Sequence, residues 1–188
     1  MATMTMQTTS ENSDAPRRTM RRYMLLSLIV IICMMPVVII ILQASGYAGT
    51  MDDTQLGFNA EIIKSYLALM TAEGLLLFKL GNLMDYLFII SYGTFFYHSA
   101  RYLTWNYQDG SIPKRVGTIF ASIGVLAAVC DGIENVFLFL MTFDPVGFPN
   151  WLAIAHSTFA TLKFIMMYSS ILWLIVAAIL KRTILKPK

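Results

Sequence analysis

Five ionisable side chains lie inside long apolar stretches of this chain, where no neighbouring polar sequence accounts for them. They are Asp85, Asp131, Glu134, His156 and Lys163. A charged side chain in apolar surroundings is costly unless another charge, a proton or a hydrogen bond compensates it. These five are therefore the candidates for chemistry: carboxyl and imidazole groups that can exchange protons, and an ammonium that can pair with an anion.

The spacing of the polar residues places them on defined faces of helices. In the third apolar stretch, small residues recur at steps of four and three and end in Asp131 and Asn135, with Glu134 one turn from Asp131. Faces of small residues let membrane helices approach closely. The three predicted faces are Gly117, Ala121, Gly124, Ala128, Asp131 and Asn135; Asn82, Asp85 and Tyr92; and His156, Lys163 and Ser170.

The depths of the five candidates along their helices can be compared from the helical rise. With about 1.5 Å per residue, Asp85 and Asp131 lie about 15 Å from the outer ends of their spans. The corresponding depths are about 10 Å for Glu134, about 8 Å for His156 and about 18 Å for Lys163. All five fall in the outer half to the middle of a bilayer, which predicts one shared site.

Counting the charges of this site gives an imbalance. Asp85, Asp131 and Glu134 would contribute three negative charges, against one positive charge from Lys163. Two uncompensated negative charges are not sustainable in a low-dielectric interior. Either a carboxyl is protonated, or His156 is charged, or a cation binds. The alternative interpretation is an ion pair of Lys163 with Asp131 or Glu134 that only fixes the helix register.

Recognised catalytic and metal-binding motifs are absent from the sequence. It has no Gly-rich phosphate loop, no G-x-S-x-G, no HExxH and no CxxC. Asp131 and Glu134 form Asp-x-x-Glu, whereas carboxylate bundles that hold metals use Glu-x-x-His. We therefore predict no metal site, and the sequence names no cofactor. A haem held by two histidines is excluded, because His98 and His156 fall at opposite ends of their spans.

The composition identifies the class of protein. Hydrophobic residues make up 57% of the chain and charged residues 13%, with a mean hydropathy of +0.64. Ordinary soluble domains have about 45–50% and about 25%. These values exclude a disordered chain, a small disulfide-rich secreted protein and an ordinary soluble enzyme, and they leave an integral membrane protein. The net charge of +3 gives no indication of nucleic-acid binding.

Four stretches are long enough to cross a bilayer, which takes about 20 apolar residues. The predicted spans are about 23–42, 75–97, 116–141 and 151–180. Asn59 and the segment after it predict a short amphipathic helix at the membrane surface before the second span. Residues 1–16, rich in Thr, Ser and Met, predict a disordered cytoplasmic tail, and residues 17–188 a single membrane domain.

The distribution of Lys and Arg predicts the orientation. Four spans place most of these residues on one side of the membrane: Arg17, Arg18, Arg21, Arg22, Arg101, Lys114, Arg115, Lys181, Arg182, Lys186 and Lys188. Because cytoplasmic loops carry the excess of positive charge, both termini are expected in the cytoplasm, in a plasma-membrane protein. The alternative for the first span is a cleaved signal peptide, but its apolar core exceeds the usual 7–15 residues.

The order of the polar residues resembles that of a group of small prokaryotic four-span membrane proteins of unassigned function. Asp85-Tyr86 stands in one span, Asp131, Glu134 and Asn135 in the next, and Lys163 in the last. The resemblance brings no activity with it. It implies that these polar residues belong together.

The predicted fold is therefore all-α, an integral membrane four-helix antiparallel bundle with a short amphipathic interfacial helix. The leading functional hypothesis is a site that binds a proton, a cation or a small ligand in the outer half of the bilayer, in a protein related to transport. Its predicted residues are Asp85, Asp131, Glu134, Asn135, His156 and Lys163.

Two other functional classes stay open. The first is an accessory or structural subunit of a membrane complex, without catalytic activity. The second is a lipid-modifying membrane enzyme, with Glu134 or Asp131 as general acid–base and Lys163 positioning an anionic headgroup. The predicted partners are the lipid bilayer and either a second copy of the chain or another subunit of a membrane complex. No nucleic acid is among them.

Overall fold

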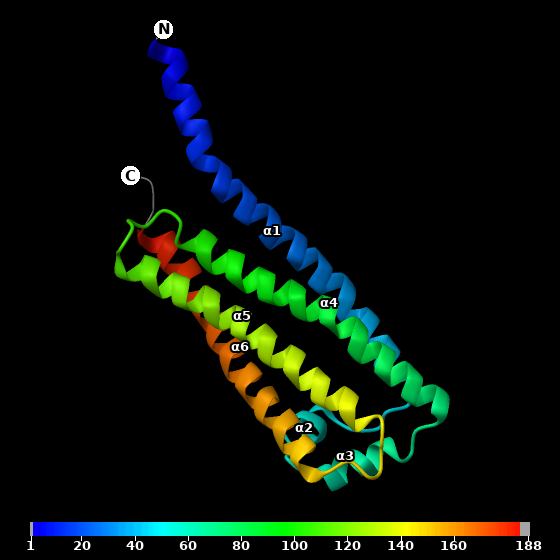
Figure 1. Cartoon of the computed structure of the whole chain (residues 1–188). Coiled ribbons are helices and arrows are strands. Elements are labelled where there is room, and N and C mark those ends of the chain that lie inside the picture. Colours follow the sequence, from blue (N-terminus) through cyan, green and yellow to red (C-terminus); the bar gives the residue numbers. More distant parts are fainter. Residues whose placement is uncertain (1, 185–188) are drawn as a thin grey trace.

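The computed structural model describes residues 2–184, with side chains for 15–50 and 52–181, and this part of the chain is all-helical (Figure 1). Its helices are α1 (Ala2–Ala44), α2 (Met51–Gln55), α3 (Ala60–Leu67), α4 (Ala72–Leu103), α5 (Ile112–Met141) and α6 (Asn150–Ile184). Four of them contain segments long and apolar enough to cross a membrane: Ala15–Ala44, Ala72–Leu103, Ile112–Met141 and Asn150–Lys181. The predicted all-α membrane bundle is confirmed.

The long helices pack in chain order. α1 lies along α4, α4 along α5, and α5 along α6, while α4 also touches α6. In Figure 1 the start of α1 and the end of α6 lie at one end of the bundle, and α2 and α3 cover the other. We call the latter the α2–α3 end. α1 makes no comparable contact with α5 or α6. Helices α4, α5 and α6 therefore form a three-helix group, and α1 packs on this group through α4.

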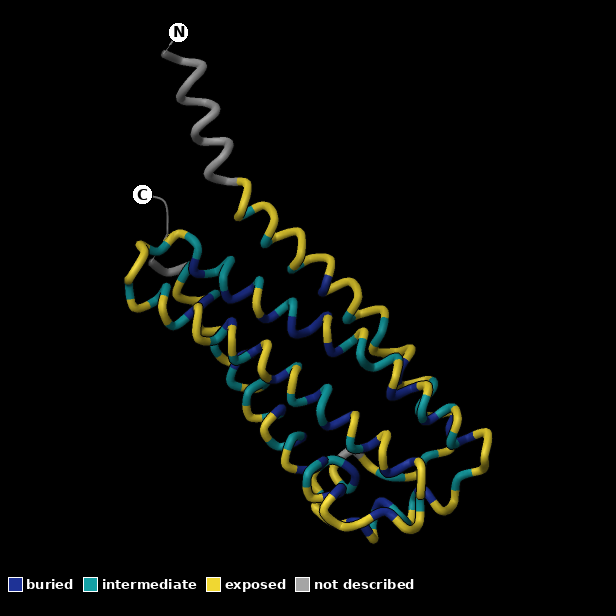
Figure 2. Tube along the Cα trace, viewed as in Figure 1, coloured by how far each residue is buried: buried dark blue, intermediate teal, exposed yellow. Residues whose placement is uncertain are grey.

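Burial follows this arrangement. Figure 2 shows buried segments along the facing sides of α4, α5 and α6, whereas most of α1 from residue 15 onward is exposed. Within residues 23–42 of α1, most of the exposed residues are large and apolar, such as Leu26, Ile32 and Ile40. A helix that is apolar all round and exposed in this way is suited to contact with lipid.

Small residues allow α4 and α5 to approach closely. A Cβ added to Gly93 of α4 would lie 2.7 Å from the Cβ of Ala128 of α5, and one added to Gly124 would collide with Phe96. Backbones can come this close only where side chains are small. The small-residue face predicted for the third span is therefore a packing face, and it turns Asp131 toward the interior.

The predicted amphipathic helix is α3, which packs against the beginning of α6. Its Asn59 cap accepts a hydrogen bond from the N–H of Glu61, and Ile63 and Leu67 are buried on one face. Just before α3, the backbone N–H of Phe58 donates to Ser157 Oγ at 3.1 Å. These contacts fix the connection between α2 and α3 against α6.

The long helices extend beyond the predicted spans. α4 continues from Glu73 in its first turn to Arg101 in its last, because polar residues at helix ends continue a helix without belonging to its apolar stretch. The tail predicted for residues 1–16 falls mostly on positions whose side chains lie outside the described part of the chain. That tail stays a prediction.

Candidate functional site

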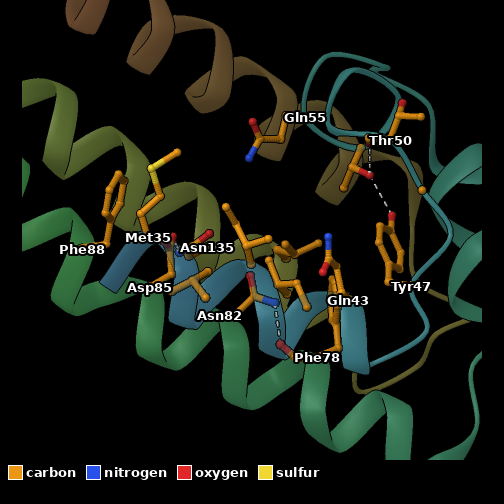
Figure 3. A pocket seen from close by; sticks show the side chains of 16 residues that line it. Met35, Gln43, Tyr47, Thr50, Gln55, Phe78, Asn82, Asp85, Phe88 and Asn135 are labelled. Atoms are coloured by element: carbon orange, nitrogen blue, oxygen red, sulfur yellow. Dashed lines mark hydrogen bonds between the residues drawn. The ribbon is translucent and has the colours of Figure 1, made fainter. Parts of the chain in front are cut away.

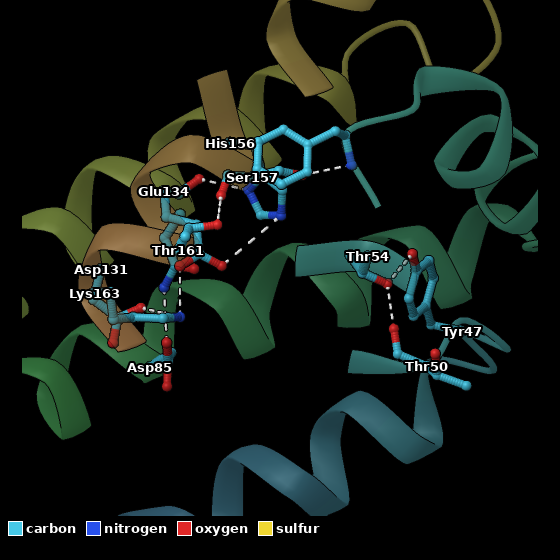
Figure 4. A network of polar contacts seen from close by, with 12 residues as sticks. Tyr47, Thr50, Thr54, Asp85, Asp131, Glu134, His156, Ser157, Thr161 and Lys163 are labelled. Carbon is cyan, nitrogen blue, oxygen red and sulfur yellow. Dashed lines mark hydrogen bonds and ion pairs between the residues drawn. The ribbon is translucent and has the colours of Figure 1, made fainter. Parts of the chain in front are cut away.

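Lys163 of α6 bridges two carboxylates of α5 (Figure 4). Its Nζ lies 3.0 Å from Asp131 Oδ1 and 2.5 Å from Glu134 Oε2. The exposed fractions of the three residues are 5% for Lys163, 6% for Asp131 and 0% for Glu134. Asp131 and Glu134 are three residues apart, so one turn of helix presents both to the same ammonium. A single buried cation thus serves two buried carboxylates.

Tyr92 of α4 completes the surroundings of Asp131. Its hydroxyl donates to Asp131 Oδ2 at 2.9 Å, so both oxygens of this carboxylate have a partner. The sequence placed Tyr92 on the same face as Asp85 but did not identify it as a site residue. The available signal was its hydroxyl, because a buried tyrosine usually finds a hydrogen-bond partner.

His156 lies against Glu134 and is fully buried. Its Nδ1 is 3.2 Å from the backbone oxygen of Glu134, and its Nε2 is 3.8 Å from Glu134 Oε1. A carbonyl oxygen can only accept, so this hydrogen bond requires the hydrogen on Nδ1. That leaves Nε2 facing the carboxyl group, either as a neutral acceptor or as the second N–H of an imidazolium.

Asp85 of α4 forms no ion pair with Lys163 and is hydrogen-bonded to Asn135 of α5. The Asn135 amide donates to Asp85 Oδ2 at 2.8 Å. Within the described residues no Lys, Arg or His nitrogen forms an ion pair with Asp85. Asp85 is partly exposed, whereas the Lys163 group is buried. Among the three carboxylates of the site, Asp85 is therefore the one that forms no ion pair and is not fully buried.

Asp85 opens onto a cleft between α1, α4 and α5 (Figure 3). The cleft has a volume of about 560 Å³. Its polar lining consists of Asn82, Asp85 and Asn135 from α4 and α5, and of Gln43, Tyr47, Thr50, Thr54 and Gln55 toward the α2–α3 end. Its apolar lining includes Met35, Val38, Ile39, Leu42, Phe78, Phe88 and Leu138. The cleft exists because α1 packs along α4 without closing onto α5.

Hydrogen bonds tie the α2 segment to the end of this cleft. Tyr47 and Thr54 share a hydrogen bond of 2.8 Å between their hydroxyl oxygens, and Thr54 also donates to the backbone oxygen of Thr50. Burial raises the pKa of Tyr47 to about 12. Nearby, Tyr66 donates to Asp53, and this hydrogen bond raises the pKa of Tyr66. The segment is thus held in place by neutral phenol groups.

The structure brings the predicted site residues together in two adjoining groups. The buried group consists of Asp131, Glu134, His156 and Lys163. The cleft group consists of Asp85 and Asn135. Asn135 follows Glu134 directly in α5, so the two groups are neighbours along one helix. The cleft residues of the α2 segment were not predicted, because they lie outside any periodic apolar pattern.

The arrangement limits the chemistry that the site can do. Glu134 is fully buried and does not line the cleft, so a general acid–base role for it lacks access to a lipid substrate. Among the residues described, no group of three His, Cys, Asp or Glu side chains is arranged to hold a metal ion. Lys163 Nζ stands between Asp131 and Glu134, where a bound cation would otherwise lie.

Comparisons with models of protein families, with curated proteins and with solved structures find no match for this chain. The geometry and the charge of the site are therefore the basis on which a function can be assigned.

Proposed function

We propose that this membrane protein takes up positive charge, as a proton or a small cation, at a carboxyl site that the Asp85 cleft connects to one side of the membrane. The observation that carries the proposal is the excess of carboxyl groups over ammonium groups in the site. Asp85, Asp131 and Glu134 stand together with Lys163 as the only ammonium among the described side chains in contact with any of them.

The contacts within the site indicate which carboxylate keeps an uncompensated negative charge. Lys163 and Asp131 neutralise each other at 3.0 Å. Glu134 and His156 can then carry one proton between them, on the carboxyl group or on the imidazole; Oε1 and Nε2 are 3.8 Å apart and form no hydrogen bond. In both forms this second pair is neutral as a unit. Asp85 is left with one negative charge, which a proton or a cation from the cleft would balance.

The predicted orientation gives this uptake a direction. If both termini are cytoplasmic, the α2–α3 end faces the outside and the cleft lies in the outer half of the bilayer. The protein would then exchange charge with the external side. A transport role for a chain of this size would require a second copy or a partner subunit, and the exchange at Asp85 would be one step of it.

Infrared spectroscopy of the protein in lipid nanodiscs tests the proposal. We expect a protonated carboxyl band near neutral pH that is lost or reduced in Asp85→Asn or Glu134→Gln. An alternative supporting result is a carboxylate band that shifts when Na⁺, K⁺ or NH₄⁺ is added and does not shift in Asp85→Asn. The matched control is Glu73→Gln, which removes an exposed carboxyl from the first turn of α4.

One result would contradict the proposal. If every carboxyl is ionised across the neutral range and no cation changes the spectrum, Asp85 takes up neither a proton nor a cation. Lys163 would then be a structural ion pair, as expected of an accessory subunit, and the surplus negative charge would be tolerated through hydrogen bonds such as that from Asn135.

A further inference from the structure

We propose that the cleft at Asp85 is a binding site for an amphipathic organic monocation, with the amine against Asp85 and the apolar body along α1. The inference rests on the proposed function and names the class of ligand that would supply the missing positive charge. It is drawn from the cleft lining, which combines a carboxylate without a cation and a large apolar surface.

The environment of Asp85 suits an ammonium group. Asn135 occupies Oδ2, so Oδ1 is left for a ligand. Figure 3 shows Asp85 between Phe88 and Met35 on one side and Asn82 on the other. An aromatic ring beside a carboxylate attracts organic cations through its electron-rich face, in addition to the ionic contact.

The apolar lining suits an organic body rather than an inorganic ion. Val38, Ile39 and Leu42 of α1 form one wall, opposite Phe78 and Leu138. An inorganic cation would need several oxygen ligands around it, whereas the side chains that line the cleft beside Asp85 are apolar apart from the amides of Asn82 and Asn135. The volume of about 560 Å³ falls within the range of about 300–1,000 Å³ found for small-molecule sites.

Charge also excludes other amphipathic ligands. An anion would be repelled by ionised Asp85, and a neutral molecule would leave its negative charge without a counter-charge, with only the hydrogen bond from Asn135. Polar residues such as Gln43 and Gln55 line the cleft toward the α2–α3 end. They would give an ammonium group a polar approach, while α1, which packs on α4 and makes no comparable contact with α5, would leave the α5 side accessible to an apolar body.

The probe for this inference is n-octylammonium, measured against 1-octanol and octanoate with the full chain in nanodiscs of zwitterionic lipid. Binding is measured by titration calorimetry. Partitioning of the probe into lipid is the same for wild type and variants, so the difference between them reports binding to the protein. We expect Asp85→Asn to weaken octylammonium binding at least about tenfold and to leave octanol unchanged. Glu73→Gln is the control for loss of an exposed carboxyl, and should bind as wild type does.

A second variant tests the cleft without touching the carboxylate. Ile39 lines the cleft and is 43% exposed, so Ile39→Trp should narrow it and weaken octylammonium binding severalfold. Equal affinity for octylammonium and octanol would mean that the cleft recognises only the alkyl chain, and would overturn the inference. An Asp85→Asn variant that melts like wild type and binds octylammonium equally well would also overturn it.

The infrared measurement separates the two proposals. If the Asp85-dependent carboxyl signal is present and octylammonium does not bind, only the ligand class is wrong. If both the signal and the binding are missing, the proposed function falls as well.

Discussion

Lys163 of α6 and Asp131 of α5 form an ion pair of 3.0 Å in the interior of the bundle. The two residues differ in the other contacts that each of them makes. Asp131 also receives a hydrogen bond from Tyr92, and Lys163 also contacts Glu134. No other described cation reaches either carboxylate, except His156 if it is protonated. Removing the lysine and removing one acid should therefore have unequal consequences.

The first prediction concerns this inequality. Lys163→Met leaves two buried carboxylates without their ammonium and should lower the free energy of unfolding by about 3–5 kcal/mol. Asp131→Asn leaves Lys163 paired with Glu134 and should cost clearly less. Chemical denaturation in mild detergent, followed by circular dichroism, measures both. Equal losses in the two variants would show that Glu134 does not share the lysine.

The second prediction concerns Tyr92, whose hydroxyl donates to Asp131 at 2.9 Å. Tyr92→Phe keeps the ring and removes a hydrogen bond to a charged group, so the free energy of unfolding should fall by about 1.5–3 kcal/mol. The matched control is Tyr168→Phe, because Tyr168 is 62% exposed and should tolerate the loss of its hydroxyl. If the two variants are equally stable, Tyr92 contributes only packing.

The third prediction concerns the close packing of α4 and α5. An added Cβ at Gly124 collides with Phe96, whereas one at Gly132 lies 3.5 Å from the ring of Tyr86, an ordinary contact. Gly124→Ala should therefore lower the free energy of unfolding by about 1–3 kcal/mol. Gly132→Ala should be neutral or should stabilise by up to about 1 kcal/mol, because alanine favours helix. Similar losses in both would contradict the observed helix contact.

These contacts show how much of the site the sequence could predict. Helical spacing placed Asp131 and Glu134 on one face, and the cost of a buried charge pointed to Lys163 as their partner. The role of Tyr92 was not predictable, because an aromatic residue in a span fits packing equally well. The separation of Asp85 from the Lys163 group was also not predictable, since it depends on which helices are neighbours.

The same distinction holds for the fold. Apolar length predicted four spans, and the capping residue Asn59 with the pattern after it predicted α3. The packing of α1 on α4 alone has no counterpart in the sequence, because an apolar helix carries no mark of which neighbour it prefers. The cleft follows from that packing. Its lining by Thr54 and Gln55 follows from the position of a short helix without apolar periodicity.

The fourth prediction concerns pH and the segment that holds the end of the cleft. Tyr47 has a pKa of about 12 in the folded protein, above its ordinary value of about 10, so folding favours the neutral phenol. The stabilisation is complete below pH 10 and is lost as the pH rises toward 12, because the unfolded chain then binds fewer protons. Tyr47→Phe should not show this part of the loss of folding stability at alkaline pH.

Denaturation at several pH values between 9 and about 12 measures the effect as a difference in slope between wild type and Tyr47→Phe. Tyr66 contributes in the same direction through Asp53, which is why the comparison with the variant is needed. Parallel slopes for the two proteins would mean that Tyr47 does not titrate differently on folding.

The most direct test of the surplus negative charge is the stability of Asp85→Asn beside that of Lys163→Met, with no added ligand. Asparagine can still accept the hydrogen bond from Asn135, so this substitution removes the charge and keeps that contact, with an NH2 group in place of the other oxygen. If Asp85 is held for binding, Asp85→Asn should melt at or above the wild-type temperature, while Lys163→Met melts far below it. A loss of stability in Asp85→Asn as large as in Lys163→Met would contradict the account, because Asp85 would then be part of the structural ion-pair network.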